Sequence, residues 1–152
     1  MDFGETPRRL LDLPSYAITA IAARAAQLAA ERVAVLGVPK AAYGVLAVLD
    51  ERGSSSQAEL GRRLGMDRRS VSETAVSLEE GSWVTRRPDP SDPRRNSLDI
   101  TADGRRLLAR LEASFVTMQD ELLGALPTED RAELHRLLLL LAAGSGPGDG
   151  QA

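Results

Sequence analysis

The sequence of 152 residues contains no cysteine, only one histidine and very few aromatic residues. Without cysteine, disulfide bonds, thiolate zinc sites and thiol-based redox sensing are all excluded. The single histidine, His135, leaves little material for a metal site, so we expect neither a metal nor a cofactor. Because aromatic residues make up only 3% of the chain, leucine, alanine and valine must build the core. This composition favours helices over a β-sandwich.

Long apolar runs, a signal peptide and enzyme motifs are also missing. The longest uninterrupted apolar run, residues 137–143, is too short to span a membrane. The first residues, MDFGETPRRLLDL, lack the basic-then-apolar pattern of a secretory signal. No serine lies in a G-x-S-x-G context, and no glycine-rich loop follows a strand-like segment. We therefore expect a soluble cytoplasmic protein with no membrane partner and no enzymatic activity.

The charge is unevenly distributed along the chain. The net charge is −3, yet residues 52–106 contain 11 arginines against nine acidic residues. A mildly basic middle between acidic flanks is compatible with a nucleic-acid site, although the excess alone is small. Residues 86–101, RRPDPSDPRRNSLDIT, hold four of these arginines together with three prolines. This stretch therefore has to be explained by any functional hypothesis.

Helical segments occupy both ends of the chain. Pro14 can begin a helix that ends at Gly37, and Pro39 can begin a second helix that ends at Gly53. After the middle segment, a long helix is expected at about residues 102–126, and Pro127 begins the last one. We expect a single domain over residues 14–143, preceded by a flexible arm at 1–13 and followed by a flexible tail at 144–152.

Capping signals in the middle of the chain predict a helix-turn-helix. Ser56 and Glu59 have the spacing of a capping box, in which each side chain bonds the backbone N–H of the other residue. The helix that follows should end at Leu64, and Asp67 is placed to cap a second helix over residues 68–80. Two helices joined by a short turn that contains glycine are typical of a helix-turn-helix.

A β-hairpin is predicted directly after this motif. Residues 83–87 and 96–100 alternate like strands, and the proline-rich stretch joins them. The prolines should stiffen the tip, so its arginines lose less entropy on binding. Asp92 is close enough in sequence to orient the guanidinium of Arg94, with Arg95 as support. An extended basic tip beside a recognition helix can enter a minor groove, whereas the alternative is a solvated turn with internal ion pairs.

The predicted helix over residues 68–80 has two faces. At 100° per residue, four residues should face the core: Val71, Thr74, Ala75 and Leu78. Four others point away: Arg69, Ser72, Glu73 and Val76. Arg68 lies at the flank, and Ser70 with the helix N-terminus can contact phosphate. Arginine can donate two hydrogen bonds to guanine, serine can either donate or accept one, and glutamate can accept one from the N4 amino group of cytosine. Alternatively, Arg69 and Glu73 form a simple surface ion pair.

Several of these motifs together resemble the multiple antibiotic resistance regulator (MarR) family of bacterial winged-helix repressors. The matching residues in and before the predicted recognition helix are Gln57-Ala58-Glu59-Leu60, Leu64-Gly65, Asp67-Arg68, Val71-Ser72 and Leu78-Glu79. The match continues through Trp83-Val84, Arg86, Asp89-Pro90-Ser91-Asp92-x-Arg94 and Ile100-Thr101-Ala102-Asp103-Gly104. The pattern from the wing into the following helix is the most specific part, and the order of helices over about residues 14–143 also agrees.

The resemblance implies a mainly α fold with a small β-hairpin wing. The winged helix-turn-helix would cover about residues 38–100, and dimerisation helices about residues 14–36 and 102–143. It further implies a homodimer that binds double-stranded DNA at a pseudo-palindromic operator and represses transcription until a small aromatic or phenolic ligand binds. Tyr16, Arg24 and Tyr43 are the candidate ligand residues, although an ordinary packing or surface role is favoured for each of them.

The sequence departs from the family pattern at three positions. The family usually has glycine where Ser82 stands, often has a basic residue where Glu73 stands, and has an arginine-like residue where Pro93 stands. At the first position, either Gly81 takes over the role or the helix cap is reshaped. In the wing, Arg94 and Arg95 must carry the tip. Glu73 should weaken phosphate attraction or read cytosine. It therefore keeps an alternative open, in which the winged helix is a protein–protein interaction module with weak or lost DNA binding.

Overall fold

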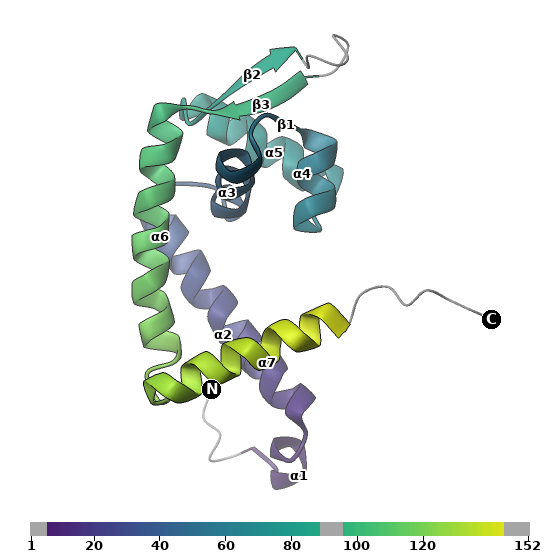
Figure 1. Ribbon diagram of the computed structural model, residues 1–152, viewed down its shortest axis with the longest axis vertical. Helices are drawn as coiled ribbons and strands as arrows, with labels where there is room; N and C mark the ends of the chain where they lie inside the picture. The colour runs from purple at the N-terminus through teal and green to yellow at the C-terminus, as the bar shows by residue number, and fades with distance from the viewer. Residues whose placement is uncertain (1–5, 89–95, 145–152) are drawn as a thin grey trace, which may run out of the picture. The chain divides into compact units, whose positions relative to one another are not determined.

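The computed structural model describes residues 6–88 and 96–144, and this part of the chain is mainly helical with three short strands (Figure 1). The elements, in chain order, are α1 (Arg8–Leu11), α2 (Pro14–Val35), α3 (Ala42–Arg52), β1 (Ser55–Ser56), α4 (Gln57–Leu64), α5 (Arg68–Glu80), β2 (Val84–Pro88), β3 (Asn96–Ile100), α6 (Ala102–Leu122) and α7 (Thr128–Gly144). The chain divides into two units, residues 1–118 and residues 119–152.

The strands of the first unit form an antiparallel sheet in the order β1-β3-β2. β2 and β3 lie side by side as a hairpin, with Val84 opposite Ile100 at its base (Figure 1). β1 pairs with the other edge of β3, where Ser55 lies opposite Leu98. The third strand was not predicted, because two serines show no alternation of apolar and polar residues.

The core of the first unit is aliphatic, as the shortage of aromatic residues predicts. Its fully buried side chains come from five helices and two strands: Leu28, Val45, Leu46, Leu49, Leu60, Val71, Leu78, Val84, Leu98 and Leu111. The four residues that the periodicity of α5 turned inward, Val71, Thr74, Ala75 and Leu78, are its four buried residues. α5 is therefore fixed to the core along one face, and the opposite face is left exposed.

The turn after α5 uses an unusual backbone conformation. Ser82 has a φ of 60°, whereas Gly81 has a φ of −76°. Ser82, and not Gly81, therefore occupies the left-handed position. Gly81 has a different, steric reason to be glycine, because a Cβ there would collide with the Trp83 ring. A Cβ at Gly104 would likewise collide with the carbonyl oxygen of Trp83. Thr101 connects the turn after α5 to the start of α6, since its hydroxyl donates to the Ser82 carbonyl at 2.8 Å and accepts from the Gly104 N–H at 2.9 Å.

The second unit contains the end of α6 and the whole of α7. Arg131 connects the two helices, because its Nε donates to the Leu126 carbonyl at 3.0 Å and its Nη1 lies 3.0 Å from Asp120 Oδ1. No residue of α7 is buried within this chain. Its five consecutive leucines, residues 137–141, are 43% to 58% exposed.

The predicted fold class is confirmed: a mainly helical chain with a small antiparallel wing. The predicted helices at residues 57–64 and 68–80 have the observed bounds, because their caps are encoded locally. The long helix ends at Leu122, earlier than the predicted Leu126, and α1 falls within the residues expected to form an arm. Among the described helices, none combines the length and apolar character needed to cross a membrane.

Candidate nucleic-acid interface

Side-chain caps set the position of the helix-turn-helix. The Ser56 hydroxyl accepts from the Glu59 N–H at 3.3 Å, while Glu59 Oε2 accepts from the Ser56 N–H at 2.8 Å. The Ser56 N–H and the Ser56 hydroxyl both donate to Glu59 Oε2, and these two hydrogen bonds lower the pKa of the Glu59 carboxyl. At the end of α4, Gly65 adopts the left-handed conformation with a φ of 63°, which turns the chain toward α5. The predicted capping box and turn are thus present.

Asp67 caps α5 and uses the hydroxyl group of Ser70. Asp67 Oδ1 accepts from the Ser70 N–H at 2.9 Å, and Oδ2 accepts from the Ser70 hydroxyl at 2.7 Å. The backbone hydrogen bond from Ser70 is the main reason that the pKa of Asp67 is lowered. Because its proton is donated to Asp67, the Ser70 hydroxyl has to give up this bond before it can donate to a phosphate.

The exposed face of α5 carries an ion pair. Arg69 Nε lies 2.7 Å from Glu73 Oε1, and the two side chains are 87% and 64% exposed. The hydrogen bond that Arg69 donates to the Glu73 carboxylate raises the pKa of Arg69. The pair occupies the Nε edge of the guanidinium, so the two terminal nitrogens remain available for a bidentate contact with guanine. Ser72, on the neighbouring position of the helix, is half-buried.

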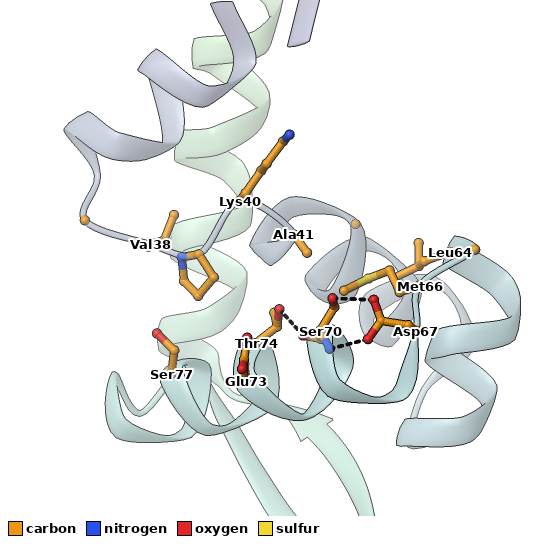
Figure 2. A pocket seen from close by; sticks show the side chains of 14 residues that line it. Val38, Lys40, Ala41, Leu64, Met66, Asp67, Ser70, Glu73, Thr74 and Ser77 are labelled. Atoms are coloured by element: carbon orange, nitrogen blue, oxygen red, sulfur yellow. Dashed lines mark hydrogen bonds between the residues drawn. The ribbon is translucent and has the colours of Figure 1, made fainter. Parts of the chain in front are cut away.

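A groove runs along one flank of α5 (Figure 2). We name it the acidic groove, because Asp67 and Glu73 contribute two carboxylates to its lining and Lys40 one ammonium. Its volume is about 920 Å³, and the α2–α3 connection forms the wall that faces α5. The hydroxyls of Ser70, Thr74 and Ser77 lie along α5, and the Lys40 side chain extends away from that helix (Figure 2).

A second groove joins α4, the start of α5 and the base of the wing. We name it the basic groove; its volume is about 670 Å³ and its lining residues are Ser56, Gln57, Ala58, Gly61, Arg62, Met66, Arg68, Arg86 and Asn96. Arg86 is oriented by Glu79 at the end of α5, since its Nε and Nη2 lie 3.3 and 3.2 Å from Glu79 Oε2. Of the predicted site residues that the structure describes, this groove includes Arg68 alone.

Sequence reasoning missed the role of α4 in this groove. Gln57, Ala58, Gly61 and Arg62 follow the i, i+1, i+4, i+5 spacing of one helix face, so the signal was present. It could not be interpreted without the wing beside it. The predicted wing residues Asp92, Arg94 and Arg95 lie outside the described residues.

The three candidate ligand residues are not brought together in either groove. Tyr43 is half-buried and packs edge-on against Phe115, with 4.8 Å between the ring centroids and 63° between the ring planes. Tyr16 is half-buried on α2, and Arg24 is an exposed residue of the same helix. Tyr43 thus has a packing partner that joins α3 to α6.

Comparison with known proteins decides the family. Residues 36–95 match the sequence model of the MarR family. A DNA-bound structure titled "Transcriptional repressor, CouR, bound to a 23-mer DNA duplex" is 29% identical, with a TM-score of 0.78 over 93% of this chain and 98% of that chain. The chain belongs to the MarR family of winged helix-turn-helix transcriptional regulators. This is a family of regulators and not of enzymes.

Two further relatives extend the comparison. A protein of Thauera aromatica, named "Putative transcriptional regulatory protein for hcr operon", is 31% identical over 102 residues, or 67% of this chain. The matched region spans 61% of that relative's length. BpsR of Bordetella bronchiseptica, whose DNA binding is described as regulated by 6-hydroxynicotinic acid, shares the MarR fold. It is 18% identical with a TM-score of 0.74, over 93% of this chain and 96% of that chain.

Proposed function

We propose that this MarR-family protein is a sequence-specific regulator of transcription that binds double-stranded DNA through α5 and the wing. The observation that carries the proposal is the exposed N-terminal half of α5, which presents Arg68 and Arg69 beside a β-hairpin. Arg69 has a free edge for guanine, and Ser72 and Glu73 are the next candidates for base contacts. Arg94, oriented by Asp92, is proposed to contact the adjacent minor groove with Arg95 as support.

The regulator is further proposed to act as a homodimer. The exposed leucines of α7 and the exposed Ile18 and Ile21 of α2 give each predicted dimerisation helix an apolar surface that a second copy of the chain could cover. A two-fold dimer places two recognition helices about 34–36 Å apart, and its operator should then be pseudo-palindromic.

Small aromatic or phenolic ligands are the proposed effectors, and repression is the proposed outcome of DNA binding. The regulation of the similar BpsR by 6-hydroxynicotinic acid supports this class of ligand. Tyr16, Arg24 and Tyr43 remain the proposed contacts. A panel of aromatic carboxylic acids should contain at least one that raises the melting temperature and releases DNA. Loss of that response in Arg24→Gln, with DNA binding retained, would place the ligand at this site.

Selection of bound duplexes from a random pool tests the DNA-binding function and the symmetry of the operator together. We expect an enriched pseudo-palindrome whose affinity falls steeply with salt, because each phosphate contact releases counterions. A pool without enrichment, together with no binding to any duplex at low salt, would reject DNA binding.

A second candidate function is a winged helix that docks on another protein. The Arg69–Glu73 pair favours it, because one of the two arginines at the start of α5 already has a carboxylate partner. The salt titration separates the two functions, since a protein-docking module should lack affinity for duplex DNA even at low salt.

A further inference from the structure

We infer that the basic groove holds one phosphodiester backbone of the bound duplex, and that Arg62 of α4 is a phosphate contact. The inference rests on the proposed DNA-binding function and assigns it an additional surface. None of the DNA-contacting residues that were predicted from the sequence lies on α4. The groove adds four polar residues to the interface: Gln57, Arg62, Arg86 and Asn96.

The charges that the described residues contribute to the groove are of one sign. Within residues 6–88 and 96–144, its lining includes three guanidinium groups and no carboxylate. Arg62 and Arg68 are exposed, and neither forms an ion pair with another residue in the ranges 6–88 and 96–144. Arg86 uses Nε and Nη2 for Glu79, which leaves Nη1 for another acceptor. An anion here would therefore meet available donors without displacing an internal pair.

The start of α4 adds backbone donors to these side chains. The Ser56 hydroxyl satisfies the Glu59 N–H, whereas the N–H groups of Gln57 and Ala58 have no carbonyl within the helix to bond. Both residues line the groove. The nearby Glu59 carboxylate is held by the N–H and hydroxyl of Ser56 and is not part of the lining. The groove therefore combines arginines with a helix N-terminus, which together favour phosphate.

The position of the groove identifies the anion as a DNA backbone. A major groove about 12 Å wide accommodates a helix of about 10–12 Å, so phosphates must pass along both flanks of α5. At 100° per residue, Arg68 lies on one flank, while Ser70, Glu73 and Ser77 lie on the other. The basic groove thus attracts one strand on the first flank. The acidic groove, with two carboxylates against one ammonium, attracts the other strand less on the second flank. The duplex should be held more closely on the α4 side.

Two adjacent arginines on α4 provide a matched test. Arg62 lines the groove, whereas Arg63 does not; both are exposed, and neutralising either changes the net charge by the same amount. Fluorescence anisotropy should be measured across a salt series, with the selected operator and with a duplex of scrambled sequence. Arg62→Gln should weaken binding to both duplexes by the same factor, and the slope of log K against log salt should become shallower by about one.

Arg63→Gln should leave the slope unchanged, and Arg62→Lys should restore it, because lysine keeps the charge. Arg68→Gln supplies a second groove variant should Arg62→Gln lose its fold by circular dichroism. Equal slope changes in the Arg62 and Arg63 variants would overturn the inference, because they would show a general field effect. An unchanged slope in both groove variants would overturn it too. In either case the wild type still binds DNA, so the outcome differs from failure of the proposed function itself, in which the wild type binds no duplex.

Discussion

Glu73 is the single residue that most alters how α5 can meet DNA. Its carboxylate neutralises Arg69 and holds that guanidinium by Nε, so it should limit attraction to phosphate while leaving one edge of Arg69 for a base. The Arg69–Glu73 ion pair thus both lowers the expected affinity for DNA and orients the Arg69 guanidinium. The pair is exposed, so it should add little to the stability of the fold.

Replacing Glu73 by glutamine should therefore separate affinity from specificity. We expect Glu73→Gln to bind a scrambled duplex several-fold more tightly with a steeper salt dependence, because Arg69 becomes free to contact phosphate. Discrimination among bases at one operator position should fall at the same time. Anisotropy titrations against single-base operator variants measure both effects. Glu80→Gln, the same charge change at the exposed end of α5, is the control, and an equal effect there would assign the result to net charge.

Ser82 has a strained left-handed backbone at a position where the family usually has glycine. A left-handed backbone costs a residue with a Cβ about 1–2 kcal/mol, whereas glycine adopts it freely and loses about 0.5–1 kcal/mol of entropy on folding. Ser82→Gly should thus stabilise the protein by roughly 0.5–1 kcal/mol, seen as a higher urea midpoint with unchanged slope. Gly81→Ala should destabilise it, because a Cβ there meets the Trp83 ring. Loss of stability in Ser82→Gly would show that the serine side chain has a stabilising role.

At the scale of elements, the sequence predicted helix boundaries best where a side chain bonds the backbone of a residue close to it in the chain. Ser56, Asp67 and Thr101 cap their helices by bonds that reach three residues along the chain, so the boundaries could be found from spacing alone. The short strand β1 depends instead on pairing with β3, which is more than forty residues away. The basic groove depends on the same kind of distant assembly. Local signals therefore predicted the helices, while surfaces built from several elements required the structure.

The wing is the element whose predicted role is tested most directly by mutation. Arg94→Ala should weaken operator binding at least tenfold, because the resemblance and the proline-stiffened sequence place this arginine at the tip. Arg110→Ala, on the exposed surface of α6, removes the same charge away from the hairpin and should bind nearly as well as wild type. Anisotropy titration at one salt concentration suffices for the comparison. Unchanged affinity in Arg94→Ala would remove the wing tip from the mechanism.

At the scale of the whole molecule, the α7 leucines call for a partner surface. Five consecutive leucines cover more than one side of a helix, and these five are 43% to 58% exposed, an apolar surface of the kind that marks an interface. A second copy of the chain is the simplest partner for a regulator that is proposed to bind a pseudo-palindromic operator. Light scattering at micromolar concentration should therefore give the mass of a dimer, and a monomer mass would contradict the proposed assembly.

A charged residue within this leucine run should separate the two copies and show what dimerisation contributes to DNA binding. Leu139 is 58% exposed in the single chain, and a glutamate there would lose its hydration in an interface. We expect Leu139→Glu to be monomeric, whereas Val76→Glu, at a 44% exposed position on α5, should remain dimeric. The monomer would make half the phosphate contacts, so its salt slope on the operator should fall to about half. It would also lose the gain that comes from linking two half-site contacts. A monomeric variant that kept the full slope would show that one chain covers the whole operator, which is incompatible with two recognition helices one DNA turn apart.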